Sequence, residues 1–267
     1  MKRVRFRKME GAGNDYVFVD GIREALPLDR APELAQRWSD RHFGIGADGL
    51  IVLLRGAGAP VRMAMWNADG SRGAMCGNGL RCLARLARDH GHVATDAFPV
   101  ATDAGLRAVE LLGPDRVRTD LGTVRCGSPT RIDLAGAALE YVPGDAGNPH
   151  AVVFVAAVDR CDVAGLGRAL QARRDLFPDS VNVEFVEVLA PDLICQRTYE
   201  RGSGETLACG TGAAVAALAA RQTGRCSGHT IDVQLRGGRL RALLGRSSLA
   251  IEGPVRTVFT GEILLPE

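Results

Sequence analysis

Two cysteines have nearly identical surroundings in this sequence. Cys76 begins the tetrapeptide Cys-Gly-Asn-Gly, and Cys209 begins Cys-Gly-Thr-Gly. Each tetrapeptide opens an apolar stretch with helical periodicity, so each cysteine is expected at a helix N-terminus, where unpaired N–H groups and a partial positive charge favour an anion. Such a position can lower the pKa of a thiol from about 8.5 to roughly 3.5–7.5. We therefore expect thiolate character at both cysteines.

Two such thiols suit the inversion of a stereocentre. If the two helix starts face each other across a cleft, a thiolate can remove a proton from one face of a carbon while a thiol delivers a proton to the other face. The glycines let the backbone approach a ligand closely. The helix N–H groups could hold a carboxylate as charge develops beside it, so no organic cofactor is expected.

The tetrapeptides belong to a longer internal repeat, offset by 133 to 134 residues. The pairs that match are Gly13 and Asn14 with Gly147 and Asn148, Trp66 and Asn67 with Tyr199 and Glu200, Gly91 with Gly224, and Gly105 with Gly238. A single such tetrapeptide would be more typical of a turn beside a small buried cysteine. The aligned second copy favours the acid/base interpretation.

The repeat predicts an α+β fold of two pseudo-symmetric lobes, each a mostly antiparallel sheet or barrel wrapped around one central helix. In the first helix a stripe of Leu80, Leu83, Ala84 and Ala87 lies opposite Arg81, Arg85 and Arg88. The second, Ala213 to Ala220, is apolar all round and should be buried. Strand-like runs cover 17–20, 50–54, 152–155, 183–188 and 249–251.

The boundary between the lobes is expected near Asp120 to Thr123. This gives an N-terminal lobe of residues 1–120 and a C-terminal lobe of residues 121–254. A final strand-like segment, Val255 to Leu265, could return to the first lobe, so residues 255–267 are assigned to it.

Composition narrows the class of protein. The 267 residues are 46% hydrophobic and 24% charged, which is typical of a globular protein. Because 33 Lys and Arg are nearly balanced by 31 Asp and Glu, the net charge is too small to attract nucleic acid or an anionic membrane. The N-terminus lacks a signal-peptide core, so a cytoplasmic location is expected. The odd number of cysteines, 7, without a CxxC pair or Cys/His cluster predicts free thiols and no metal.

Lysine is nearly absent, since Lys2 and Lys8 are the only two. A pyridoxal phosphate enzyme needs a lysine held in its pocket to form a Schiff base. A pyridoxal enzyme is therefore disfavoured.

Six segments resemble the diaminopimelate epimerase family over essentially the whole chain. They are GAGNDY at 11–16, GIGADG at 44–49, WNADGS at 66–71 with CGNGLRC at 76–82, GNPH at 147–150, VNVEF at 181–185, and YERGSGETLACGTG at 199–212. The resemblance implies an epimerase that interconverts LL- and meso-2,6-diaminopimelate without a cofactor, in lysine and peptidoglycan precursor biosynthesis. The expected binding partner of the protein is diaminopimelate, and assembly into a homodimer is compatible with the resemblance.

The same resemblance implies roles for individual residues. Cys76 and Cys209 would be the acid/base pair, assisted by His150 and Glu200. Substrate would be bound by Asn14, Asn67, Asn148, Asn182, Glu200 and Arg201, and by the backbone of Gly77, Asn78, Gly210 and Thr211. Because diaminopimelate carries an amino-acid group at each end, the end that does not react needs a carboxylate clamp, which the bidentate fork of Arg201 could supply.

Two positions depart from the family pattern. Gly49 stands where some members have glutamine, and Glu10 stands where histidine is frequent. Any side-chain contact from position 49 is lost.

Three alternatives remain open. A proline racemase or 4-hydroxyproline epimerase also uses two cysteines, but Arg201 and four asparagines match a compact apolar ring poorly. Phenazine-type isomerases resemble the fold but lack the thiol pair. From a different class, facing thiols could form the disulfide switch of a redox sensor. Exchange of solvent deuterium into the α-carbon of diaminopimelate would separate an epimerase from a sensor.

Overall fold

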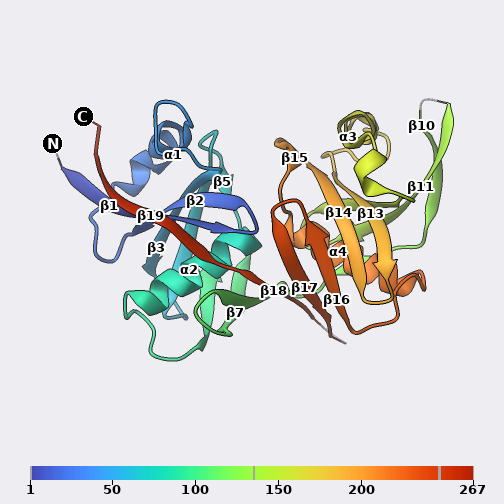
Figure 1. The fold of residues 1–267 in the computed structure, drawn as a ribbon. Helices are drawn as coiled ribbons and strands as arrows, with labels where there is room; N and C mark the ends of the chain where they lie inside the picture. Colours follow the sequence, from blue (N-terminus) through green and yellow to red (C-terminus); the bar gives the residue numbers. More distant parts are fainter. Residues whose placement is uncertain (1, 135, 246–247, 267) are drawn as a thin grey trace. The chain divides into compact units, whose positions relative to one another are not determined.

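The computed structural model of the protein describes residues 2–134, 136–245 and 248–266. The chain divides into two compact units (Figure 1). Unit 1 comprises Met1–Thr119 and Gly253–Glu267, and unit 2 comprises Asp120–Glu252. Within the described ranges, no helix has the length and apolar character needed to span a membrane.

Unit 1 is built on a strongly curved sheet. Its strands are β1 (Arg3–Gly11), β2 (Asn14–Asp20), β3 (Gly49–Arg55), β4 (Val61–Asn67), β5 (Arg72–Gly73), β6 (Ala97–Thr102), β7 (Gly105–Leu111), β8 (Arg116–Asp120) and β19 (Arg256–Leu264). Hydrogen bonds connect them in the order β19, β1, β2, β3, β4, β6, β7 and β8. The pairs β2–β3 and β4–β6 are parallel, and the other neighbours are antiparallel.

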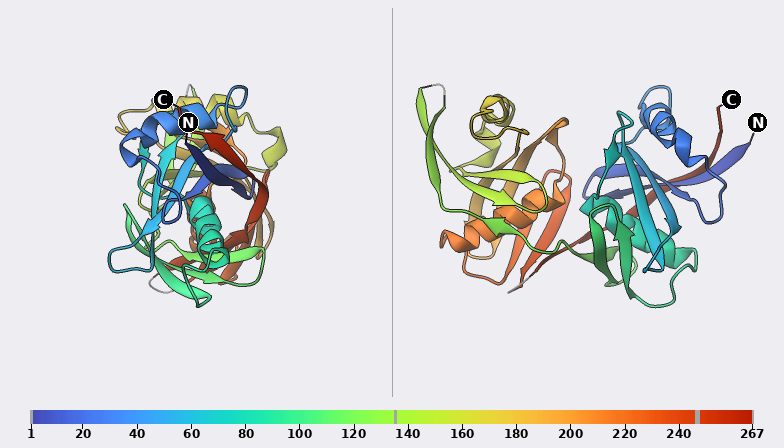
Figure 2. Two further views of the ribbon diagram at one scale, coloured as in Figure 1. Left: turned by 90° about the vertical axis from the view of Figure 1, so that its left-hand side faces the viewer. Right: turned by 180° about the vertical axis from the view of Figure 1, so that it is seen from behind.

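Two helices pack on this sheet. Helix α2 (Gly77–Asp89) is enclosed by the strands, as the left view of Figure 2 shows, and Leu80 and Leu83 join Ile51 and Met63 in the core. Helix α1 (Ala31–Ser39), preceded by a 3-10 turn at Leu28–Arg30, packs a second apolar cluster on the outer side. The sheet of unit 1 therefore has a core on each side.

Unit 2 repeats this arrangement. Its strands are β9 (Arg125–Cys126), β10 (Thr130–Leu134), β11 (Ala137–Asp145), β12 (Pro149–Phe154), β13 (Asn182–Ala190), β14 (Leu193–Glu200), β15 (Gly204–Thr206), β16 (Thr230–Leu235), β17 (Gly238–Leu244) and β18 (Leu249–Pro254). Its helices are a 3-10 turn (Val158–Arg160), α3 (Val163–Ala172) and α4 (Gly210–Gln222). The parallel pairs β12–β13 and β14–β16 correspond to β2–β3 and β4–β6 of unit 1.

These observations confirm the predicted fold class, and the right view of Figure 2 shows α4 against the strands of its own unit. The sequence analysis predicted one helix in each lobe, and the structure adds α1 and α3. Helix α3 was missed because Gly165 and Gly167 lower its helix propensity. Gly167 lies against the Tyr199 ring, where a larger side chain would collide.

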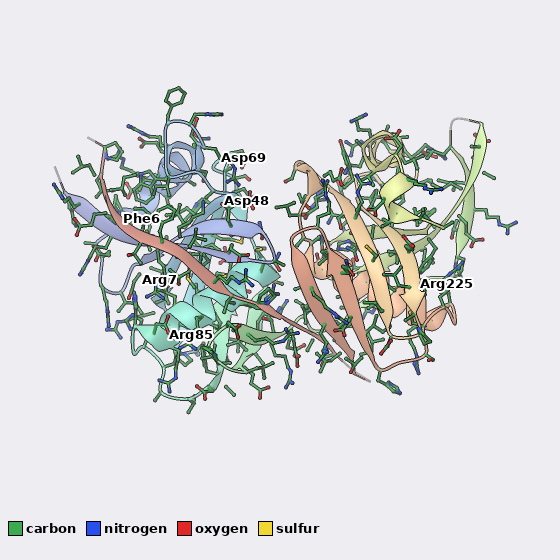
Figure 3. The ribbon with its side chains drawn as sticks, viewed as in Figure 1. Phe6, Arg7, Asp48, Asp69, Arg85 and Arg225 are labelled. Carbon is green, nitrogen blue, oxygen red and sulfur yellow. The ribbon has the colours of Figure 1, made fainter. Side chains whose placement is uncertain are left out.

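The orientation of Arg81 differs from the prediction. Its place in the helical pattern put it on the polar face of α2 with Arg85 and Arg88, but its side chain is completely buried. Arg85 does lie toward the surface, paired with Asp89 (Figure 3). Arg81 differs because it lies near the start of α2, where the end of β1 packs over it: a Cβ on Gly11 would lie 3.5 Å from Arg81 Nη2.

The far end of α2 is tied to β2 by a buried carboxylate. Asp20 Oδ2 lies 2.7 Å from His90 Nδ1 and 2.7 Å from His92 Nε2, and Oδ1 accepts the Ile22 N–H at 3.1 Å. Burial by itself would raise the pKa of Asp20, but the hydrogen bonds from His92 and His90 lower it overall. The carboxylate form therefore stabilises the folded chain.

Asp20→Ala should lower the free energy of unfolding by about 1–3 kcal/mol, because it leaves buried donors without an acceptor. Since the pKa is lowered on folding, this contribution is present above the ordinary value of 3.8 and is lost as the pH falls through the folded value. Urea unfolding over a range of pH checks both points. Asp175→Ala, which removes an exposed partner of Arg173, is the control and should cost little.

Candidate active site

In unit 1, Cys76 caps the N-terminus of α2. Its φ of −128° is extended, and its Sγ accepts the Gly79 N–H at 3.4 Å. The same sulfur lies 3.2 Å from Asn14 Oδ1. Asn78, in the first turn of α2, donates to that oxygen at 3.3 Å. The structure thus brings together three of the predicted site residues, Asn14, Cys76 and Asn78.

A tight turn between β1 and β2 positions Asn14. Ala12 and Gly13 both have positive φ, 54° and 82°, a conformation that glycine adopts freely and alanine rarely. Glu10 Oε2 accepts the Gly13 N–H at 2.8 Å and fastens the turn. Asn14 Nδ2 then donates to Asp48 Oδ2 at 2.6 Å; Asp48 directly precedes β3 (Figure 3).

Tyr16 is a further neighbour of Cys76. Burial, followed by the adjacent Cys76 thiol, keeps the pKa of the Tyr16 hydroxyl well above its ordinary value. The hydroxyl therefore stays neutral and hydrogen-bonds with the sulfur. The sequence analysis did not identify Tyr16 because an aromatic residue in an apolar strand is typical of a core.

In unit 2, Cys209 caps α4 in the same way. Its φ is −120°, and its Sγ accepts the Gly212 N–H at 3.4 Å and lies 3.4 Å from Thr211 Oγ1. Cys209 is 5% exposed. The predicted placement of both cysteines at helix starts is confirmed.

Carboxylates surround Cys209. Glu200, at the end of β14, accepts the Thr206 hydroxyl at 2.5 Å and also contacts the Cys209 thiol. His150 is almost completely buried, with Nδ1 2.8 Å from Glu184 Oε1 and Nε2 3.1 Å from Asn148 Oδ1. Unit 2 therefore gathers Cys209, Thr211, Glu200, His150 and Asn148, together with Glu184, which was not predicted.

The predicted thiolate character of Cys209 is wrong for this structure. Burial, followed by the charges of Glu200 and Glu184, raises the pKa of the Cys209 thiol well above its ordinary value. The Thr211 hydroxyl and the Gly212 N–H act in the opposite direction but do not prevail. The helix terminus is outweighed here because a buried thiolate would face two carboxylates.

Arg201 and Asn182 form a third group in unit 2. Asn182 Oδ1 accepts the Arg201 backbone N–H at 2.8 Å, and Arg201 Nη1 donates to the Asp179 carbonyl at 2.9 Å. The Arg201 side chain is exposed. Asn67, at the end of β4, instead donates to Ser71 Oγ at 2.9 Å.

Glu184 and Arg81 are two buried charges near the cysteines that the sequence did not predict. Strand β13 contains two acids, Glu184 and Glu187, each between apolar neighbours, and this placement is the signal that could have identified Glu184, the one of the two that is completely buried. Arg81 carried no such signal, because helical periodicity placed it on a polar face. Whether a side chain near a helix start is buried depends on which other segment of the chain packs against it, and the periodicity of the sequence does not show this.

One group among the described residues has the composition of a metal site, namely Asp20, His90 and His92. Arg7 Nη2 lies 3.3 Å from His90 Nε2, and Arg23 Nε lies 3.6 Å from Asp20 Oδ2. Two guanidinium groups beside the cluster disfavour a bound cation. The cluster is explained by its hydrogen bonds, which join α2 to β2.

The chain matches one known protein family over most of its length. The family model described as diaminopimelate epimerase matches residues 6–127 and 144–256. The chain belongs to the diaminopimelate epimerase family. A diaminopimelate epimerase of Desulfovibrio desulfuricans is 40% identical over 284 residues, covering 97% of this chain and 98% of the relative. Another, from Xylella fastidiosa strain M23, is 42% identical over 278 residues, with 97% and 95% covered.

Solved structures extend the likeness to the fold. A Bacillus anthracis phenazine biosynthesis protein of the PhzF family has a TM-score of 0.74 at 17% identity, with 99% of this chain and 100% of that chain covered. A probable proline racemase from Agrobacterium radiobacter K84 has a TM-score of 0.73 at 16% identity, with 98% and 93% covered. At these identities the likeness concerns the fold alone.

The two departures from the family pattern have local explanations. A side chain at position 49 would meet the Trp66 carbonyl and the Tyr16 ring, so the backbone is too close for glutamine without a shift. Glu10 supplies the carboxylate that fastens the Ala12 and Gly13 turn. Glu10 therefore stabilises the turn that precedes Asn14, and Gly49 allows β3 to lie close to Trp66 and Tyr16.

Glu200→Gln should change stability in a pH-dependent way. Burial, despite hydrogen bonds from Thr206 and Cys209, raises the pKa of Glu200. The folded protein then holds this proton more tightly than the unfolded chain, so the carboxyl contributes stability at low pH that is lost as the pH rises above its ordinary value of 4.5. We expect the variant to gain stability relative to the wild type between about pH 5 and about pH 8.

Glu205→Gln is the matched control, because the pKa of Glu205 is shifted in the direction opposite to that of Glu200. Hydrogen bonds from Arg197 lower the pKa of Glu205, so the stabilisation by this carboxylate is already complete above its ordinary value of 4.5, and its loss should cost about the same at pH 5 and at pH 8. Urea unfolding of both variants at the two pH values makes the comparison. If the difference between Glu200→Gln and the wild type did not change with pH, Glu200 would not have a raised pKa.

Proposed function

We propose that this protein is an epimerase that interconverts LL- and meso-2,6-diaminopimelate, with Cys76 and Cys209 as the acid/base pair. The single observation that carries the proposal is the pair of cysteines that cap α2 and α4, found in a chain 35–42% identical to proteins named diaminopimelate epimerase. The activity would belong to lysine and peptidoglycan precursor biosynthesis.

The proposed reaction consists of two proton transfers. The thiolate of one cysteine takes the α-proton from one face of the reacting carbon and becomes a thiol. The thiol of the other cysteine gives its proton to the opposite face and becomes a thiolate. The substrate is inverted, no atom is gained or lost, and the charge has passed from one cysteine to the other.

Removal of an α-proton leaves negative charge that spreads onto the carboxylate. We propose that the helix starts carry this charge, with backbone N–H groups of Gly77, Asn78, Gly210 and Thr211 directed at the substrate. Neither lysine is available to hold a pyridoxal group: Lys8 is buried in an ion pair with Asp15 at 2.6 Å, and Lys2 donates to the Ala25 carbonyl. This supports a mechanism without pyridoxal.

We assign binding of the unreactive end of diaminopimelate to Arg201, Asn182 and the other predicted asparagines. Arg201 supports this assignment because its side chain is exposed and, among the described residues, its guanidinium donates to a backbone carbonyl and forms no ion pair. Proline racemase remains a weaker candidate, since the likeness to that enzyme lies at 16% identity. A compact apolar ring also has no second carboxylate for Arg201.

Cys76→Ala and Cys209→Ala should each lower kcat by about 10²–10⁴-fold or more, because each removes the proton carrier from one face of the carbon. Both variants should keep the circular dichroism spectrum of the wild type. Cys161→Ala is the control, since this half-buried thiol does not cap a helix N-terminus (the N-cap of α3 is Asp162), and the variant should stay active. Substantial epimerisation by either site variant would contradict the two-base assignment.

Arg201→Lys keeps the charge but removes the bidentate fork. Loss of such a contact should cost about 1.5–3 kcal/mol, or roughly 10- to 150-fold in kcat/KM, mainly through KM. Exchange of solvent deuterium into diaminopimelate at saturating concentration should survive, in contrast to the cysteine variants. Normal binding of diaminopimelate by Arg201→Lys would show that another group holds the distal carboxylate.

A further inference from the structure

The two helix starts share a backbone geometry but differ in the buried charges beneath them. A Cβ on Gly79 would meet the Ile51 side chain, and a Cβ on Gly212 would meet the Glu184 carboxylate. Ile51 and Glu184 therefore hold equivalent positions under α2 and α4. An apolar group in unit 1 is replaced by a carboxyl group in unit 2.

Two more equivalent positions differ in the same direction. The fifth residue after Cys76 is Arg81, whereas the fifth after Cys209 is Ala214. The residue nine before Cys76 is the neutral Asn67, and the residue nine before Cys209 is Glu200. At each of the three differences the position in unit 1 is the more positive one.

Arg81 is an unusual buried cation. It is 0% exposed, and among the described atoms its Nε and Nη1 have no hydrogen-bond partner. Nη2 donates to Asn78 Oδ1 at 2.5 Å, and that amide in turn donates to Asn14, which contacts Cys76. Burial lowers the pKa of Arg81, while the neighbouring Cys82 and Cys76 act to raise it. A buried cation this poorly compensated is costly unless an anion lies close by.

Of the two thiols near Arg81, Cys76 is the one that can be this anion. Burial raises the pKa of Cys82 to about 12, despite the adjacent Arg81 charge, so Cys82 stays a thiol. Cys76 is less buried and already has the Gly79 N–H and the Tyr16 hydroxyl as donors for a thiolate. Ionisation of Cys76 would therefore compensate the guanidinium.

We propose that Arg81 is a positioning residue that favours the thiolate form of Cys76, while Glu184 and Glu200 favour the thiol form of Cys209. The resting enzyme would then hold its base in unit 1 and its acid in unit 2. This inference rests on the proposed function and adds the group that sets the protonation state of each cysteine.

Other charged groups also lie near Arg81 and Cys209, and near Arg81 one of each sign largely offsets the other. Arg116 adds positive charge near Arg81, and Glu10 adds a carboxylate that also lies 4.0 Å from Arg256. Near Cys209, the two ring nitrogens of His150 face Glu184 Oε1 and Asn148 Oδ1, and two carboxyl groups, Glu184 and Glu200, lie close to the thiol. The surroundings of Cys209 stay the more negative.

The hydrogen bond between Cys76 and Asn14 must change when Cys76 ionises. Asn14 Oδ1 faces the sulfur, and an oxygen cannot donate to a thiolate. Turning the Asn14 amide over would offer Nδ2 to the sulfur and Oδ1 to Asp48, and the hydrogen bond from Asn78 Nδ2 to Asn14 Oδ1 would then be lost. Asp48 can donate in return when protonated, since burial, followed by the nearby Asp15 charge, raises its pKa.

The test follows the alkylation of each cysteine by iodoacetamide over a range of pH in the full chain without substrate, with peptide mass spectrometry to separate the sites. The pH midpoint reports ionisation, whereas the limiting rate also reflects access. Cys76 should reach its midpoint at a lower pH than Cys209. Arg81→Met should raise the Cys76 midpoint by about one unit or more, and Arg81→Lys should restore it.

Two further variants separate electrostatics from packing. Arg85→Met, on the outer face of the same helix (Figure 3), should leave the Cys76 midpoint unchanged. Glu184→Gln should lower the Cys209 midpoint, a shift opposite in sign and at the other cysteine. If Arg81→Met fails to fold, Arg81→Gln supplies the neutral side chain, and Glu184→Gln tests the second half alone.

A merely structural role for Arg81 would lower stability without a selective shift at Cys76, and that result would overturn the inference. The outcome is distinguishable from failure of the proposed function. If alkylation of Cys76 left epimerase activity intact, the two-base assignment itself would be wrong. If alkylation abolished activity but the midpoint ignored Arg81, only the inference would fail. In the confirming case the acidic limb of kcat/KM moves upward with the Cys76 midpoint in Arg81→Met.

Discussion

A cysteine that caps a buried helix is the arrangement on which the rest of this structure depends. In each cap an extended cysteine accepts, through its sulfur, the N–H of the residue three positions later. That residue is glycine, because a side chain there would collide with Ile51 in unit 1 or with Glu184 in unit 2. The strands of unit 1 enclose α2, and the turn at Gly13 places Asn14 against the cysteine that caps this helix. Fold and chemistry therefore share one element in each unit.

Duplication provides two similar caps, and buried charge makes them different. A base and an acid must coexist at the same pH, which two identical thiols cannot do efficiently. Arg81 in unit 1 and the carboxylates Glu184 and Glu200 in unit 2 break the equivalence. These charges lower stability, since each is buried with incomplete compensation, and such costs are typical of sites adapted to chemistry.

The sequence predicted the repeat, the fold class and the helix starts, because periodicity and glycine spacing are local properties. It predicted Asn14, Glu200 and His150 only through family resemblance, since each alone is an ordinary turn or strand residue. It failed on the direction of Arg81 and on the ionisation of Cys209. Both depend on what covers a side chain in three dimensions, here the Gly11 turn and the paired carboxylates. Helices α1 and α3 were missed because they are short and contain proline or glycine.

The central claim is that two different groups act on opposite faces of one carbon. The most direct measurement converts each pure isomer of diaminopimelate in D₂O to a small extent and determines deuterium separately in product and recovered substrate. The account predicts one deuterium at the inverted carbon of the product and little in the recovered substrate, from either isomer, because the base returns the original proton while the acid delivers a solvent deuteron. Equal deuterium in product and recovered substrate would indicate one shared base and would contradict the account.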